Sequence, residues 1–173
     1  MYNRLIAFIE GNGVLTEAHH GFRTKKSTET ALQIFIKSTQ DVIEKKNEPN
    51  CNFFLDLTKA YDVLNYKVLL SKLNSYGIRG VANLWFESHL SYQKQCVEIN
   101  SVKQGIYVST TRQIEHGVTE GLILGPILFS LYINDLSLNI MGSKIMLFAD
   151  DTNILVSEAN MNNLQNKLSN VMN

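Results

Sequence analysis

The chain has 173 residues, a length that suits one domain or one domain with part of a second. Hydrophobic residues make up 45% of it and charged residues 18%, which excludes a disordered chain and a small scaffold held by disulfides. Lys and Arg total 16 and Asp and Glu total 16, so the bulk charge predicts no polyanionic partner, although a neutral protein can still have a local basic groove.

The sequence lacks the features of membrane and secreted proteins. The longest apolar run, 122–133, is interrupted by glycine, proline and serine and is far shorter than the ~20 residues that cross a bilayer. Glu10 interrupts the first apolar run too early for a secretory signal. Cys51 and Cys96 are too widely spaced to predict a zinc site or a disulfide framework. We therefore expect an intracellular protein, in the nucleus, the cytoplasm or both, with no membrane partner.

The first clear element is a helix that begins after Ser27, a residue suited to the N-cap, and ends before the polar segment 47–50. The apolar segment 51–57 then predicts a mostly buried strand. Two helices follow, one around 68–73 that stops at Gly77 and one over about 81–90. Segments 96–102 and 106–114 alternate in polarity and predict short strands.

The last third of the chain predicts a buried helix and a hairpin. The apolar segment 126–138 is long enough for one helix and has proline in its first turn. Two apolar runs, 144–149 and 152–157, flank Asp150 and Asp151, which predicts a β-hairpin with the acidic pair at or near its tip. Apolar residues at helical spacing after Ala159 predict a final helix.

Three carboxylates lie among apolar residues in the sequence: Asp56 in the strand 51–57, and Asp150 and Asp151 in the hairpin. A buried carboxylate is costly unless it is paired or binds a metal, and adjacent like charges repel. A divalent cation would relieve both costs, and oxygen ligands favour Mg²⁺ or Mn²⁺. If the hairpin pairs with the strand of Asp56, the three carboxylates meet at one sheet edge and can hold two ions ~3.5–4 Å apart, as phosphoryl-transfer sites do.

Each carboxylate also has a simpler interpretation. Asp56 alone is equally well explained as a cap for the helix that follows, and an Asp-Asp pair at a hairpin tip is most often an exposed turn. The joint pattern, a strand ending in Asp and a later strand-Asp-Asp-strand, favours the metal site.

Two loops have residues suited to phosphate. The loop before the helix at 126 has three glycines in nine residues, which lets backbone approach a nucleotide or a nucleic-acid strand, although a flexible turn is the commoner explanation. Arg23, Lys25 and Lys26 precede a helix N-terminus, where they favour a phosphate, but a solvated basic loop explains them equally well. His19 and His20 lack a metal-binding spacing, and we expect them to be exposed.

Taken in order, these segments resemble the reverse transcriptase domain of non-LTR (LINE-type) retrotransposons. The resemblance covers nearly the whole chain and depends on the ordered set, since no stretch is specific alone. The stretches are Gly21-Phe22-Arg23 with Ser27-Thr28, 54–62 (FLDLTKAYD), 76–80 (YGIRG), Gly117-Val118 with Gly121, 124–129 (LGPILF), 132–136 (YINDL) and 148–152 (FADDT).

The resemblance implies an α+β fold, the fingers–palm fragment of a right-hand polymerase, whose palm is a ferredoxin-like βαββ antiparallel sheet flanked by helices. Residues 1–50 would be part of the fingers and 51–173 the palm, with a fingers segment inserted around 66–116. The chain would be truncated before the primer grip and thumb, and no endonuclease would precede the fingers.

The implied activity is that of an RNA-directed DNA polymerase, which adds deoxynucleotides to the 3′-hydroxyl of a DNA primer on an RNA template. Carried over by position, Asp56, Asp150 and Asp151 would be the catalytic carboxylates that bind two Mg²⁺ ions, with Mn²⁺ as a substitute. The backbone carbonyl of Leu57 would also face a metal. Tyr61 would be the steric gate that excludes a ribose 2′-hydroxyl.

Further positions would bind the incoming deoxynucleoside triphosphate. Arg23, with Lys25 or Lys26, would meet its phosphates, and Gly121 would shape its pocket beside position 120. The family usually has Pro-Gln at 119 and 120, whereas this chain has Thr-Glu. An ionised Glu120 offers only acceptors and a negative charge near a triphosphate, so nucleotide binding should be weaker.

His19 and Gln93 also replace a glutamine and an arginine that are usual in the family. These departures suggest an element copy that is losing constraint. The alternative function is therefore a non-catalytic remnant that folds and at most binds nucleic acid. A nucleotidyl cyclase-like βαββ enzyme shares the metal site, but it does not explain Gly21-Phe22-Arg23 or the segment 117–129.

Overall fold

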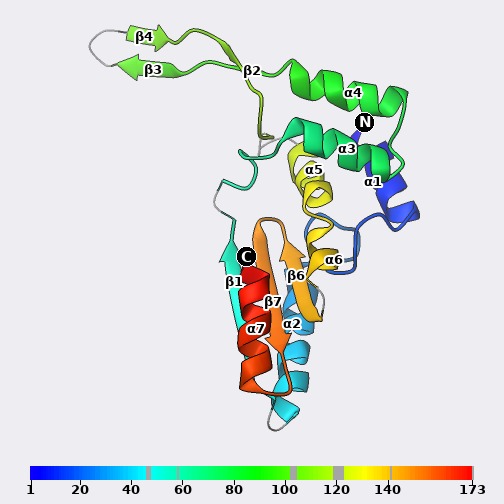
Figure 1. Ribbon diagram of the computed structural model, residues 1–173. Coiled ribbons are helices and arrows are strands. Elements are labelled where there is room, and N and C mark those ends of the chain that lie inside the picture. The colour runs from blue at the N-terminus through cyan, green and yellow to red at the C-terminus, as the bar shows by residue number, and fades with distance from the viewer. Residues whose placement is uncertain (46–47, 58, 102–104, 119–122, 141, 173) are drawn as a thin grey trace.

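The computed structural model describes residues 1–45, 48–57, 59–101, 105–118, 123–140 and 142–172. Its elements in chain order are α1 (Tyr2–Gly11), α2 (Thr28–Glu44), β1 (Asn50–Asp56), α3 (Tyr66–Ser75), α4 (Val81–Ser91), β2 (Lys94–Gln95), β3 (Glu98–Ser101), β4 (Gly105–Val108), β5 (Arg112–Gln113), α5 (Leu124–Tyr132), α6 (Leu136–Asn139), β6 (Ser143–Phe148), β7 (Asp151–Ser157) and α7 (Met161–Met172) (Figure 1). Of the helices described, none has the length and apolarity to cross a bilayer.

A three-stranded antiparallel sheet of order β1-β7-β6 forms one half of the molecule. The predicted hairpin is confirmed: β6 and β7 pair directly, and Ala149 and Asp150 form the turn between them. β1, which is almost a hundred residues earlier in the chain, pairs with β7 along its whole length, from Asn50 opposite Ser157 to Asp56 opposite Asp151.

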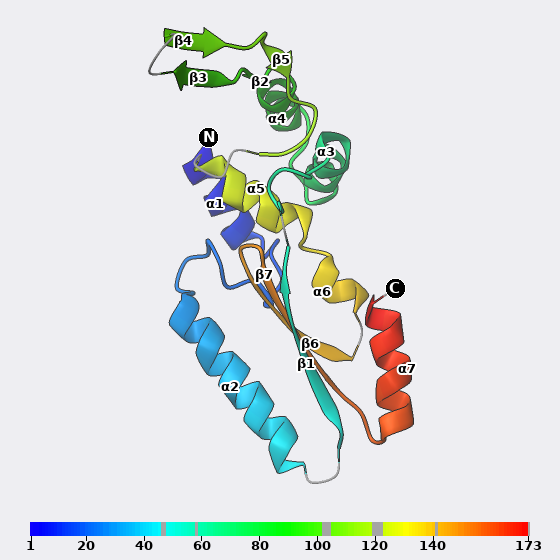
Figure 2. The same ribbon diagram turned by 90° about the vertical axis from the view of Figure 1, so that its left-hand side faces the viewer.

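The two faces of this sheet meet different helices, with α2 on one side and α7 on the other (Figure 2). Alternation along β6 and β7 turns Ile145, Leu147, Ile154 and Val156 toward α7, where they pack with Leu164 in a buried cluster. A cavity lined by α2 and by the three strands lies over the opposite face.

The prediction that the strand of Asp56 is mostly buried is wrong. β1 is an edge strand, and only its face toward α7 packs into the core. On the other face Phe54 is 73% exposed and Asp56 is exposed as well. The apolar run 51–57 therefore reflects one packed face and an uncovered one, rather than burial on both sides.

A second body of helices lies beyond the end of the sheet at which the β6–β7 turn is found (Figure 1). α1, α3, α4 and α5 share a core whose fully buried members include Leu64, Leu69, Leu90 and Leu131. The predicted strands between α4 and α5 form two short pairs, β2 with β5 and β3 with β4, and the β3–β4 hairpin projects away from this body. The helix α1 was not predicted from the sequence.

The single helix predicted over 126–138 is in fact two, α5 and α6, with a break at 133–135. The side chain of Asn134 explains the break, because it is buried and bonds to the loop after α1. Its Oδ1 accepts from the Thr16 amide at 2.9 Å, and its Nδ2 donates to the Val14 carbonyl at 2.8 Å. Asn134 thus ties the break to the loop after α1.

Candidate active site

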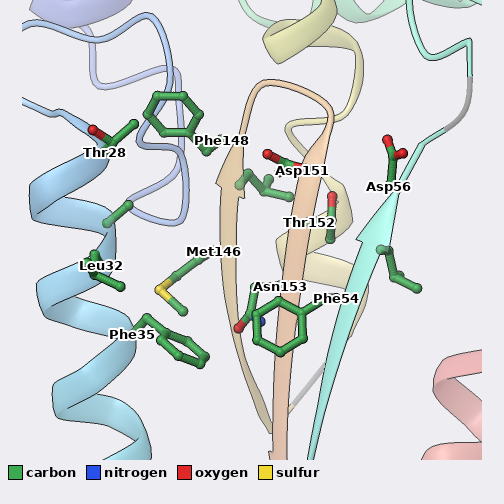
Figure 3. Close-up of a pocket in the computed structure, with 13 residues that line it drawn as sticks. Thr28, Leu32, Phe35, Phe54, Asp56, Met146, Phe148, Asp151, Thr152 and Asn153 are labelled. Atoms are coloured by element: carbon green, nitrogen blue, oxygen red, sulfur yellow. The ribbon is translucent and has the colours of Figure 1, made fainter.

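The strand register places two of the predicted carboxylates side by side. Asp56 ends β1 directly opposite Asp151, which begins β7. Residues that face each other across an antiparallel pair have Cβ atoms about 4.5–5.5 Å apart and side chains on the same face. Both side chains are exposed at the same end of the sheet, on the face toward α2 (Figure 3).

Asp150 occupies the second position of the turn, next to this pair, and is half-buried. The left-handed conformation of the turn falls on Ala149, with φ of 55°, rather than on an aspartate. For an L-residue with a Cβ such a φ costs about 1–2 kcal/mol. The turn is therefore held in a strained conformation beside the acidic residues.

A cavity of about 480 Å³ extends from these carboxylates between α2 and the open face of the sheet. Leu32 and Phe35 of α2 line one wall, and Phe54 and Met146 line the other (Figure 3). The Phe35 and Phe54 rings meet edge to face with centroids 5.6 Å apart. The site thus has an apolar body with carboxylates at one end.

The carboxylates meet some of the conditions for a divalent metal site. Among the described residues, Asp56, Asp150 and Asp151 have neither a salt bridge nor a side-chain hydrogen bond, so nothing basic offsets their charge. Asp56 and Asp151 are exposed and Asp150 is half-buried, so most of the desolvation cost expected from the sequence is absent, and like-charge repulsion is the main reason for these carboxylates to bind a cation. Within the same described ranges, no three His, Cys, Asp or Glu residues are grouped closely enough to hold an ion. The donor set fits Mg²⁺ or Mn²⁺ in chemistry, and the convergence of all three carboxylates stays a prediction.

Tyr61 follows β1 and points into the helical core rather than into open solvent. It is 8% exposed, and its ring packs against Phe129 of α5 with centroids 4.9 Å apart. Leu57 follows β1 directly. Its carbonyl accepts a hydrogen bond from the Ala60 amide at 2.9 Å, which already uses one of the two lone pairs of that oxygen. The roles predicted for Tyr61 and Leu57 stay predictions.

The loop before α5 is fastened to the segment after β1. The Val118 amide donates to the Tyr61 carbonyl and the Gly117 amide to the Leu64 carbonyl, each at 2.8 Å. The Tyr66 hydroxyl donates to the Gly117 carbonyl at 2.7 Å. Glu120 and Gly121, predicted to line the nucleotide pocket, lie outside the described residues.

Two of the three predicted phosphate-binding cations are paired with acids. Arg23, whose side chain is 10% exposed, donates to Glu10 Oε2 at 3.4 Å and to the Thr16 carbonyl at 3.0 Å. Lys26 Nζ donates to Glu17 Oε2 at 2.9 Å, and this hydrogen bond lowers the pKa of Glu17. Lys25 is exposed and has no ion-pair partner among the residues described.

The prediction that His19 and His20 are exposed is wrong, because both are only 2% exposed. Their backbone adds to the free edge of β6. The His20 amide donates to the Leu147 carbonyl at 2.8 Å, and the Leu147 amide donates to the Ala18 carbonyl at 2.9 Å. A sheet edge covered in this way buries the side chains of the covering segment.

Burial of His19 makes stability depend on pH. Burial, with the charges of Arg23, Lys26 and His20, lowers the pKa of His19 from 6.5 to about 4. Below pH 6.5 His19 is protonated in the unfolded chain but stays neutral in the folded chain. The free energy of unfolding therefore falls as the pH decreases from 6.5 to about 4. The loss should total about 3 kcal/mol. In urea unfolding, the free energy of unfolding of the wild type should fall more steeply over this pH range than that of His19→Gln. The same pH dependence in both proteins would contradict the prediction.

Comparison with known proteins identifies the family. The model of the family described as "Reverse transcriptase (RNA-dependent DNA polymerase)" matches residues 1–173. The chain belongs to this family. The resemblance to retrotransposon reverse transcriptases found in the sequence is confirmed.

The relatives of this reverse transcriptase chain include polymerases of mobile elements. It is 27% identical over 152 residues to the probable RNA-directed DNA polymerase from transposon X-element of Drosophila melanogaster, covering 86% of this chain and 16% of that protein. It is 27% identical over 134 residues to the polymerase from mobile element jockey of Drosophila funebris, covering 78% and 14%. The chain thus spans about a sixth of the length of these relatives or less.

Solved structures support the fold. A telomerase from Candida tropicalis in complex with the TWJ fragment of telomeric RNA superimposes with a TM-score of 0.66 at 11% identity, over 99% of this chain and 29% of that one. The telomerase of Candida albicans gives 0.60 at 12% identity, over 99% and 31%. This reverse transcriptase chain therefore shares the mixed helical and antiparallel-sheet fold of these polymerases.

Two close backbone contacts around the site were not predicted from the sequence. A Cβ on Gly21 would lie 2.8 Å from the Ala149 amide nitrogen, and one on Gly117 would lie 2.8 Å from the Asp62 carbonyl oxygen. Both glycines belong to the stretches that carried the resemblance. The only signal available was glycine itself, a residue used where backbones approach closely.

Proposed function

We propose that this chain is the part of a mobile element's reverse transcriptase that contains the catalytic carboxylates. Its reaction is the addition of deoxynucleotides to the 3′-hydroxyl of a DNA primer along an RNA template. The observation that carries the proposal is the pairing of Asp56 with Asp151 at one end of the sheet, beside the turn that contains Asp150. Family membership supplies the reaction class.

Asp56, Asp150 and Asp151 would hold the divalent ions, two Mg²⁺ with Mn²⁺ as a substitute, and the Leu57 carbonyl would add a ligand. Ions bound there supply Lewis-acid activation of the primer hydroxyl and neutralisation of the leaving phosphate. The protein's contribution is a fixed spacing of carboxylates, since the ladder between β1 and β7 sets the positions of Asp56 and Asp151. Asp56 and Asp151 are both exposed, which leaves them accessible to substrate.

The chain order β1, α5 with α6, β6, β7 supports a βαββ palm for 51–173, with a fingers segment around 66–116 inserted and residues 1–50 as part of the fingers. In that arrangement Tyr61 selects deoxynucleotides, and its contact with Phe129 would fix the ring. Arg23, with Lys25 or Lys26, would meet the triphosphate, once the pairs of Arg23 with Glu10 and of Lys26 with Glu17 have opened. Glu120 and Gly121 would border the nucleotide pocket.

One observation favours the alternative of a non-catalytic remnant. The acids Glu10 and Glu17 already pair with Arg23 and Lys26, which leaves Lys25 as the cation of this loop that has no ion-pair partner among the described residues. Such a remnant would fold and at most bind nucleic acid.

A primer-extension assay separates the two functions. The chain, in excess over a DNA primer annealed to an RNA template, should add deoxynucleotides when Mg²⁺ is present and stop when the metal is chelated. The same extension should occur when the rest of the jockey polymerase, of which the matched part covers 14%, is supplied in trans. A folded chain that gives no extension under either condition contradicts the proposal and supports the remnant.

A further inference from the structure

We propose that Gly21 is a positioning residue for the acidic turn, holding Asp150 and Asp151 in register by the close approach of its backbone. This inference rests on the proposed function, because it assigns the turn a role in metal binding. Gly21 would not touch substrate or metal and would act through Ala149.

The contact between Gly21 and the turn leaves no room for a side chain. A Cβ placed on Gly21 would be 2.8 Å from the Ala149 amide nitrogen and 3.5 Å from both Cα and the carbonyl carbon of Phe148. All of these are backbone atoms, so a rotamer change cannot relieve the overlap. Either the loop or the turn has to move.

The loop is anchored on both sides of Gly21. Before it, His20 and Ala18 exchange backbone hydrogen bonds with Leu147 at 2.8 and 2.9 Å, and His19 is buried. After it, Arg23 is held by Glu10 and by the Thr16 carbonyl. Because both anchors have to break before the loop can retreat, the turn is the part that yields.

The turn is poorly suited to absorb that push. Ala149 already has a φ of 55°, and Asp150 follows it directly. Metal ligands tolerate displacements of only about 0.5 Å before binding suffers. Loss of a group that orients ligands typically lowers metal affinity by about 10–100-fold.

The test is Gly21→Ala, studied by Mn²⁺ titration with NMR and by primer extension. We expect the amide shifts of residues 148–152 to change and Mn²⁺ to bind at least about tenfold more weakly. The variant should stay folded, as judged by the amide shifts of β7 residues beyond the turn. Gly11→Ala is the matched control, because Gly11 also lacks a left-handed φ and, in the part of the chain that the structure describes, a Cβ there meets no atom within 4 Å.

Unchanged shifts at 148–152 with unchanged Mn²⁺ affinity would overturn the inference. If wild-type protein shows Mn²⁺ binding but no extension, the proposed function fails while the positioning role is still decided by the Mn²⁺ comparison.

Should Gly21→Ala fail to fold, hydrogen exchange of the wild type decides. The His20 and Leu147 amides should exchange as slowly as those of the β6–β7 ladder, and fast exchange at His20 would mean that the loop does not hold the turn.

Discussion

Asp151→Asn should lower metal-dependent nucleotide addition by roughly 10³-fold, which corresponds to about 4 kcal/mol of transition-state stabilisation. The substitution keeps the shape of the side chain but removes the negative charge opposite Asp56. Asn retains an oxygen but is a much weaker ligand for a hard divalent ion. Asp56→Asn should give a loss of the same order, measured as single-turnover primer extension.

Stability should move in the opposite direction from activity. Asp56 and Asp151 are cross-strand neighbours of like charge, so removing one charge should leave the free energy of unfolding unchanged or raise it by about 0.2–1 kcal/mol. Asp41→Asn is the matched control, since Asp41 is an exposed residue of α2 that forms an ion pair with Lys144 at 3.6 Å. Primer extension that persists in both single variants, Asp56→Asn and Asp151→Asn, would contradict the proposed metal site.

Gly117→Ala should destabilise the fold by roughly 2–5 kcal/mol, because two costs add at this position. Its φ is +89°, which an alanine adopts with strain. A Cβ would also lie 2.8 and 2.9 Å from the carbonyl oxygen and Cα of Asp62. The effect is measured as the change in the free energy of unfolding in urea.

Gly105→Ala separates the two costs. Gly105 has nearly the same φ, +87°, but a Cβ there meets no atom of the described residues within 4 Å. It should therefore lose only about 1–2 kcal/mol from backbone strain. Equal losses in the two variants would mean that the contact between the 117–118 loop and the segment after β1 contributes nothing.

The local pattern of the sequence was enough to predict the hairpin and the strand that ends at Asp56. The two apolar runs on either side of Asp150 and Asp151 predict a hairpin without information from the rest of the chain. Side chains along β6 and β7 then alternate between the two faces of the sheet because the strands are pleated. The helix start at Ser27 was also local, since its side chain accepts the Thr30 amide in a capping box.

What the sequence could not provide were contacts between segments far apart. The burial of His19 depends on the free edge of β6, more than a hundred residues later. The break between α5 and α6 depends on bonds from Asn134 to the loop after α1. The exposure of Phe54 depends on how α2 lies over the sheet, which no local pattern encodes.

The same limit applies to the basic loop. Arg23 and Lys26 stand out in the sequence as free cations, but Glu10 and Glu17 reach them only after the chain has turned back. A charge that is free in sequence can therefore be neutralised in the fold, and Lys25 is the cation of the three that stays unpaired within the described part of the chain.

The most direct test of the central claim is a titration of Mn²⁺ into ¹⁵N-labelled protein, followed by the loss of amide signals. We expect broadening to begin at the amides of residues 55–57 and 149–152, and we expect Asp56→Asn to abolish this pattern while Asp41→Asn preserves it. Broadening that begins elsewhere, or a pattern that is the same in Asp56→Asn, would contradict a metal site shared by the two strands.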